Sequence, residues 1–336
     1  MQSGRETTRP PAARRAWALA AATMLAATLA GCGGGGGAGD PVGTPPGSGG
    51  PTTPPGGTVT DVQTLPAARA GVDMVSGVWR MMADVQNIIV VAPVDTLGGS
   101  RTVACSEGGS LEMVVLQNSA QPYLIHYRTR FDNCRFSGLL LQGTQEVTST
   151  RSVNESAERP WAGTVRFENY SIESASRRSE YHGLVTASGA VNGGGNSLVQ
   201  PFRATLSNFS MRSTGDALGR GTRFTTPSFQ VERLGVGPRA VPLYDMAGVW
   251  NLQAGAWSAV LDVAAGSRIA LLENEGSERF SARLQWAGDT LPDFQAALSL
   301  LPVGATSLRV ALDFDGDGSA DRSATYERST DLGLRL

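Results

Sequence analysis

The sequence predicts a mainly β protein: an antiparallel meander sheet, in the form of a sandwich or a partly open barrel, with one N-terminal helix and a small C-terminal β domain. Three observations support this fold class. Apolar residues follow a helical period between Leu65 and Ile89, they alternate with polar residues in several stretches beyond residue 100, and one short sequence unit recurs in that second region.

The early segment carries its apolar residues in one stripe. The members of the stripe are Val72, Val75, Trp79, Met82 and Ile89, with Val78 and Val85 widening it. Pro66 suits the start of a helix, where its missing N–H is not needed. We therefore expect one substantial helix lying on the sheet, with a stripe that packs as core rather than forming a binding groove.

The clearest strand covers residues 123–131, where two sets of side chains alternate. The first set is mostly aromatic or branched: Tyr123, Ile125, Tyr127, Thr129 and Phe131. The second set is mostly polar: Leu124, His126, Arg128 and Arg130. Because successive side chains of a strand point to opposite faces, the first set should face the core and the second mostly the solvent.

The recurring unit is six residues long, and its copies begin at Phe131, Phe167, Leu206 and Thr226. The first copy reads Phe131-Asp132-Asn133-Cys134-Arg135-Phe136, and the starts lie 36, 39 and 20 residues apart. This spacing favours pairs of strands in a meander, with each copy supplying one similar strand to the same sheet. The alternative is a chance resemblance, and no function attaches to the unit.

Turn-forming residues divide the rest of the chain. A glycine run predicts a loop from Asn192 to Asn196, and Pro238 to Pro242 predict a hinge before a last segment of about 95 residues. Strand-like runs in that segment cover residues 259–263, 268–272, 280–286 and 308–314. We therefore expect a helix plus antiparallel β domain over residues 61–240 and a small β domain over residues 241–336.

Charge excludes some classes of function. The formal net charge is −2 and every basic residue is an arginine, so lysine-based Schiff bases and a P-loop lysine are excluded, and the balance is not that of a nucleic-acid-binding protein. Residues 100–240 carry 15 arginines and 11 acids, whereas residues 241–336 carry 7 arginines and 13 acids. Solvated faces explain this asymmetry. A functional explanation is an arginine-bearing sheet that meets anionic lipopolysaccharide, headgroups or acidic glycans.

The start of the chain has the layout of an export signal. Four arginines come first: Arg5, Arg9, Arg14 and Arg15. An apolar stretch over residues 16–30 follows, which is too short for a comfortable membrane span, and it leads into Leu29-Ala30-Gly31-Cys32. That string resembles the lipobox of bacterial lipoproteins. The alternative is an ordinary secretion signal in which Cys32 is incidental.

The resemblance implies that residues 1–31 are removed and that the mature chain begins at Cys32, with a diacylglyceryl thioether and an acylated amine. Three acyl chains would anchor the protein stably, whereas one binds only marginally. Position 33 is Gly rather than the Asp that retains enterobacterial lipoproteins at the inner membrane, so the resemblance implies the outer membrane. In arrangement, the chain loosely resembles uncharacterised proteobacterial outer-membrane lipoproteins.

Residues 33–60 are nearly all Gly, Pro, Thr and Ser, a composition typical of a flexible tether. Treated as a coil, these 28 residues span on the order of 30 Å. Together with the lipidated cysteine they make up a tether segment, residues 32–60. The folded part is thus expected to stand clear of the lipid headgroups.

Cys105 and Cys134 form an even pair in an exported chain, where a structural disulfide is the default. Closing a loop of about 30 residues would stabilise the fold by roughly 3 to 4 kcal/mol. The alternative, a metal-binding or nucleophilic thiol, lacks neighbouring His or Cys at ligand spacing.

The sharpest internal motif runs from Asp313 to Asp321 and resembles the calcium loops of EF-hand, dockerin and thrombospondin-type repeats. The match implies five ligands: side-chain oxygens of Asp313, Asp315 and Asp317, the carbonyl of Ser319, and Asp321 directly or through water. Ala324 stands where the pattern wants a bidentate Glu, and the flanks alternate like strands rather than helices. The competing prediction is an Asp-Gly-rich hairpin turn without a cation.

Catalytic motifs are missing from the sequence: it has no Gly-x-Ser-x-Gly elbow, no His-Glu-x-x-His, and only two histidines, His126 and His182. Either could be a general base only if distant acids and a nucleophile converge on it. We therefore expect a non-catalytic envelope protein that binds or scaffolds, with an envelope protein or an anionic glycan as partner. The alternative is a glycan or ester hydrolase that uses scattered acids and one His.

Overall fold

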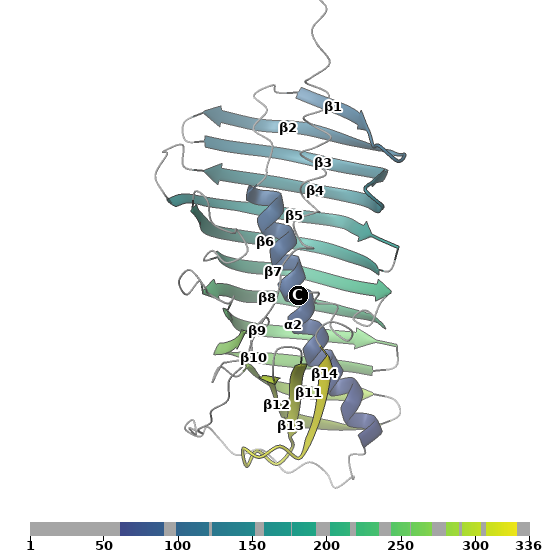
Figure 1. Cartoon of the computed structure of the whole chain (residues 1–336), viewed down its shortest axis with the longest axis vertical. Coiled ribbons are helices and arrows are strands. Elements are labelled where there is room, and N and C mark those ends of the chain that lie inside the picture. The colour runs from purple at the N-terminus through teal and green to yellow at the C-terminus, as the bar shows by residue number, and fades with distance from the viewer. Residues whose placement is uncertain are drawn as a thin grey trace, which may run out of the picture.

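The computed structural model describes residues 61–90, 99–120, 123–151, 158–175, 177–192, 202–215, 220–234, 243–255, 257–270, 280–288, 291–303 and 307–327. These ranges contain one helix and fourteen strands (Figure 1). The elements are α2 (Asp61–Val90), β1 (Gly99–Ala104), β2 (Ser110–Ala120), β3 (Tyr123–Phe136), β4 (Leu139–Arg151), β5 (Glu158–Glu173), β6 (Arg177–Asn192), β7 (Phe202–Gly215), β8 (Arg220–Leu234), β9 (Leu243–Ala254), β10 (Trp257–Ala270), β11 (Phe280–Gly288), β12 (Leu291–Val303), β13 (Ser307–Asp313) and β14 (Arg322–Glu327).

The strands form a single antiparallel sheet in which each strand pairs with its neighbours in sequence, from β1 to β14. The predicted fold class, a mainly β antiparallel meander with one early helix, is confirmed. The sheet is one open layer rather than two packed sheets, with β1 and β14 at its edges. β8 pairs with β9, so the sheet runs on past residue 240, and the division of the chain at that residue stays a prediction.

The helix packs its apolar stripe against the sheet, as predicted. Val72, Val75, Val78, Val85 and Ile89 are fully buried, and Met82 nearly so. The Trp79 side chain lies outside the described part of the chain. The helix begins at Asp61, so the prediction that it starts at Pro66 was wrong.

The helix crosses much of the sheet and contacts strands that lie far apart in it. Near its start, the Cα of Gly71 approaches β12 so closely that an added Cβ would lie 2.8 Å from the Leu298 side chain. Near its end, the carbonyl of Ile89 accepts a hydrogen bond of 3.1 Å from Ser149 Oγ in β4. Figure 1 shows α2 running across the strands between these two regions. We call the face that holds α2 the inner face and the opposite one the outer face.

The alternation predicted for β3 is confirmed. Ile125, Tyr127 and Thr129 are buried on the inner face, whereas Arg128 and Arg130 are exposed on the outer face. The same alternation continues along the other strands and gives one apolar cluster with the helix. Burial of large side chains such as Trp250 and Phe209, each worth about 2 to 3 kcal/mol, holds helix and sheet together.

The recurring sequence unit marks a line of β-bulges. Asn133, Asn169 and Asn208 occupy the third position of the first three copies, on β3, β5 and β7, and all three have positive φ, between 46° and 49°. Each sits at a shift in strand register. The copies therefore do supply similar strands to one sheet, as predicted, and the fourth copy coincides with a register shift in β8.

Glycines on the intervening strands complete this line. Gly143 of β4 and Gly183 of β6 have φ of 87° and 113° and face Asn169 and Asn208. A Cβ at Gly143 would lie 2.1 Å from the carbonyl oxygen of Asn169. Bulges bend a strand and increase its twist. The line through Asn133, Gly143, Asn169, Gly183 and Asn208, which we call the crease, is therefore where strands β3 to β7 bend.

The disulfide between Cys105 and Cys134 is present, with a Cα–Cα distance of 5.4 Å. It joins the turn after β1 to the crease in β3. Backbone hydrogen bonds reinforce this join, from Arg135 N to Gly108 O at 2.8 Å and from Glu107 N to Arg135 O at 2.9 Å. The edge of the sheet at β1 is thus fixed to β3 as well as to β2.

Several predictions fall outside the described residues: the signal over 1–31, Cys32, the tether, the loop at 193–196 and the hinge at 238–242. Within the part that is described, no helix is both long and apolar enough to cross a membrane.

Candidate functional site

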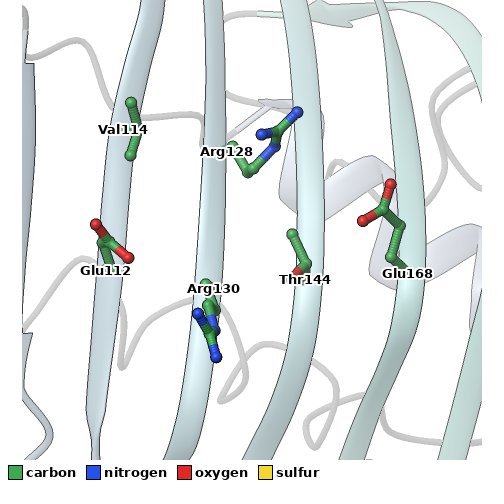
Figure 2. Close-up of a pocket in the computed structure, with 6 residues that line it drawn as sticks. All are labelled: Glu112, Val114, Arg128, Arg130, Thr144 and Glu168. Atoms are coloured by element: carbon green, nitrogen blue, oxygen red, sulfur yellow. The ribbon is translucent and has the colours of Figure 1, made fainter.

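A shallow depression of about 370 Å³ lies on the outer face, over β2 to β5 (Figure 2). Two arginines, two glutamates, one threonine and one valine line it: Arg128, Arg130, Glu112, Glu168, Thr144 and Val114. Its walls are short or charged side chains that stand on rigid strands. Such a surface suits a polar, charged ligand better than an apolar one.

Strand register builds this depression. Glu112, Arg130, Thr144 and Glu168 stand directly opposite one another in turn, one on each strand from β2 to β5. Val114 and Arg128 begin the next parallel row, two residues along. Because side chains repeat with a period of two, both rows project from the outer face.

One wall of the depression is a closed ionic cluster around Glu146 of β4. The Glu146 carboxylate accepts hydrogen bonds from Arg128 Nη2 at 2.6 Å and Nε at 3.0 Å, and its other oxygen lies 2.7 Å from His126 Nε2. The Arg128 hydrogen bond lowers the pKa of the Glu146 carboxyl, partly opposed by burial and assisted by His126. The same hydrogen bond raises the pKa of Arg128. Glu146 is therefore held as a carboxylate.

Arg130 differs from Arg128 in that its side chain forms no ion pair with a described residue. It is exposed between Glu112 and Thr144 in the register, and its guanidinium makes no ion pair with any side chain that the structure describes. The carboxylate of Glu112 accepts a hydrogen bond of 3.2 Å from Ser100 Oγ instead. Arg130 is thus the cation of the depression that has donors left for a ligand.

The two histidines stand apart. His126 is half-buried and oriented by Glu146, whereas His182 is exposed on β6 beside the crease. His182 lies three strands away from His126 across the sheet and four residues away along the strand direction. These two separations place the histidines roughly 20 Å apart. Across the neighbouring strands, His126 faces Gln117 and Thr148, and no Ser or Cys stands opposite it. The described residues therefore offer an oriented imidazole without the usual nucleophile beside it.

Two tyrosines lie in the core beneath the crease, and one of them contacts the helix. Tyr181 donates a hydrogen bond of 3.0 Å to the Asp84 carboxylate of the helix. Tyr170 stacks close by, with its ring centroid 6.5 Å from that of Tyr181. Burial raises the pKa of Tyr170 far above its ordinary range, and nearby Asp84 adds to this effect. Tyr170 therefore stays neutral and has a packing role rather than an acid–base one.

The acidic loop lies between β13 and β14, as the strand-like flanks predicted. Asp313, Asp315 and Asp317 bring one carboxylate oxygen each within 4.8 Å of one another. Backbone amides already use part of this set: the Asp313 carboxylate accepts from Gly316 N at 2.7 Å and Gly318 N at 2.9 Å. Three hard oxygen donors at this spacing fit a calcium ion through their remaining lone pairs.

The other two predicted ligands have different positions in the loop. Asp321 accepts a hydrogen bond of 2.7 Å from Phe314 N, which closes the loop at its base. Ser319 donates its N–H to Asp317 at 2.6 Å. The gathered set thus contains three of the five predicted residues, and calcium binding stays a prediction.

Sequence reasoning missed most residues of the depression, namely Glu112, Val114, Thr144 and Glu168, and also Glu146 beside it. It placed Arg128 and Arg130 on the outer face, but pairing across strands depends on register, which a single strand does not reveal. A usable signal did exist. Charged residues two positions apart occur at Arg128 and Arg130 and again at Arg166 and Glu168, as expected for outward rows of adjacent strands.

Compared with known protein families, with curated proteins and with solved structures, the chain matches none. The case for its function therefore depends on the sequence motifs and on the geometry of these sites.

Proposed function

We propose that this protein is a lipid-anchored component of the bacterial cell envelope, held at the outer membrane through Cys32, that binds an anionic envelope partner on its outer face and catalyses no reaction. The lipobox-like string Leu29-Ala30-Gly31-Cys32 supports the location. The tether over residues 33–60 would leave the sheet free to reach a partner near the membrane surface.

The observation that carries the binding role is the uncommitted guanidinium of Arg130 in the depression. Two residues along the same strand, Arg128 is paired with Glu146 at 2.6 Å, whereas Arg130 makes no ion pair with a described side chain. The Arg130 guanidinium, although Glu112 stands opposite it, thus keeps a donor fork that matches the geometry of a carboxylate or phosphate. The rigid strands on both sides would hold it in place for such a ligand. An acidic glycan is the partner chemistry that fits both this site and the location.

Binding to a polyuronate tests the role. We expect the purified chain to bind polygalacturonate more tightly than neutral dextran, and Arg130→Gln to weaken this binding about tenfold, the value of one charge-assisted contact. Arg203→Gln is the matched control, because Arg203 lies on the same face but is paired with Glu232 at 2.9 Å. Equal loss in both variants, or no binding by the wild type, would contradict the proposal.

A hydrolase is the second candidate, and the contact of His126 with Glu146 at 2.7 Å favours it. A carboxylate that orients an imidazole is part of many general-base arrangements. Screening the purified protein against generic glycan and ester substrates would decide. Activity that disappears in His126→Ala and persists in His182→Ala would replace the binding proposal with an enzymatic one.

A further inference from the structure

Two arginines face each other across β7 and β8. Arg212 and Arg223 are directly opposite in the strand register, and both are exposed. Their neighbours Met211 and Phe224 are buried on the inner face, so both arginines project from the outer face. Directly opposite residues have Cβ atoms about 4.5 to 5.5 Å apart, close enough for both guanidinium groups to reach one ligand.

The same two strands show the ordinary arrangement elsewhere. Arg203 of β7 stands opposite Glu232 of β8, and the two form an ion pair at 2.9 Å. Like charges directly opposite each other destabilise a sheet. The pairing of Arg212 with Arg223 therefore destabilises the sheet, whereas the pairing of Arg203 with Glu232 does not.

No described acid neutralises this pair. Glu180 of β6 stands opposite Arg212 on its other side, but its carboxylate lies 2.9 Å from Arg178 Nε, a distance typical of an ion pair although without hydrogen-bond alignment. Arg178 also approaches Glu173 at 3.4 Å. On the far side, the exposed Gln253 of β9 stands opposite Arg223 and offers an amide donor.

Two more arginine positions lie near this pair in the strand register. The register brings Arg177 of β6 and Arg220 of β8 to the same end of the sheet, opposite Gly215 and Thr214. The region lies beyond the crease from the depression, because Arg212 follows Asn208 in β7 whereas Arg130 precedes Asn133 in β3. It is therefore a separate location on the outer face.

We propose that Arg212 and Arg223 together bind a phosphate monoester, either the headgroup of an envelope lipid or a phosphorylated sugar. A dianion between two guanidinium groups would turn their repulsion into two charge-assisted contacts, with Gln253 as a further donor. This inference rests on the proposed binding role and adds a ligand class and a second site to it.

The test compares two double variants of the full chain that remove the same charge. Arg212→Gln/Arg223→Gln removes the site, and Arg203→Gln/Arg268→Gln removes two arginines of the same face that are paired with acids. We expect the wild type to bind phosphatidylcholine vesicles that contain phosphatidic acid. The site variant should bind at least tenfold more weakly, and the control should lose less than about threefold.

Two further measurements identify the ligand. Binding should strengthen between about pH 5 and 7, because a phosphate monoester gains its second charge near pH 6 and arginine does not titrate there. Competition by soluble glucose 1-phosphate would show that a sugar phosphate suffices, whereas vesicle binding that it does not displace assigns the site to a lipid headgroup.

Thermal melting serves as the control for correct folding. The site variant should melt no lower than the wild type, because the repulsion between the two arginines has been removed. Equal weakening in both double variants, or no binding of either phosphate probe by the wild type, would overturn the site. If the phosphate site is overturned but polygalacturonate binding still depends on Arg130, the proposed function stands without the phosphate site. Loss of the Arg130 effect alone would overturn the proposed function and leave the phosphate site.

Discussion

Gly183 of β6 approaches the backbone of Asn208 in β7 so closely that a Cβ on Gly183 would lie 2.3 Å from the Asn208 carbonyl oxygen. Its φ is 113°, a value that L side chains rarely adopt. The contact belongs to the crease, so it connects a local backbone requirement with the bend of strands β3 to β7.

Gly183→Ala should lower the free energy of unfolding by about 2 to 4 kcal/mol, from backbone strain and the clash together. Gly99→Ala is the matched control, since Gly99 has a φ of 119° but nothing within 4 Å of an added Cβ. It should cost only the conformational part, about 1 kcal/mol. Urea unfolding of both variants measures the difference. Equal losses would show that the close approach at the crease does not matter.

The disulfide should make a large contribution to stability, because it closes a loop with a sequence separation of 29. Replacing both Cys105 and Cys134 with Ser should cost about 3 to 4 kcal/mol in the chain-entropy description. Urea unfolding of this variant, and of the wild type with reductant, measures the effect. An unfolding midpoint that neither change moves would contradict the prediction.

Glu146 should make stability depend on pH in the acid range. Its folded-state pKa is lowered by Arg128, so its contribution is complete above the unfolded-state value of about 4.3 and is lost as pH falls through the lower folded-state value. Glu146→Gln should therefore cost about 1 kcal/mol at pH 7, and this cost should shrink below pH 4. Unfolding of both proteins at several pH values measures the difference. A difference that stays constant with pH would contradict a stabilising role for the Glu146 charge.

The acidic loop should respond to calcium. If Asp313, Asp315 and Asp317 bind the ion, saturating calcium at about 100 times the Kd would stabilise the fold by about 2.7 kcal/mol, and chelator would remove this gain. Asp315→Asn/Asp317→Asn should abolish the response while leaving the Asp313 contacts to Gly316 and Gly318. A melting midpoint that is the same with calcium and with chelator leaves the loop as a hairpin turn alone.

Local periodicity was enough to predict which faces are buried. The apolar stripe of α2 and the alternation of Tyr127 and Arg128 in β3 depend only on 3.6- and 2-residue repeats, and both are confirmed. The recurring unit was visible for the same reason, although its meaning was not. Its asparagines have positive φ and face glycines such as Gly143, on strands that the unit does not include.

The register between neighbouring strands could not be predicted from the sequence. Nothing within β2 or β3 specifies that Glu112 stands opposite Arg130, or within β7 and β8 that Arg212 stands opposite Arg223, because turns and bulges set these pairings. Both sites on the outer face depend on such pairs. The sequence predicted an arginine-bearing sheet and the face on which Arg130 lies, and the sheet as a whole was needed to assemble the two sites.

The location of the protein depends on Cys32, and the intact mass of the chain purified from cell membranes tests it most directly. The lipid anchor predicts a mature chain that begins at Cys32 and carries the added mass of a diacylglyceryl group and one further acyl chain, with Cys32→Ser abolishing both the cleavage and the added mass. An unmodified wild-type chain, or one that begins at another residue, would contradict an anchored binding protein.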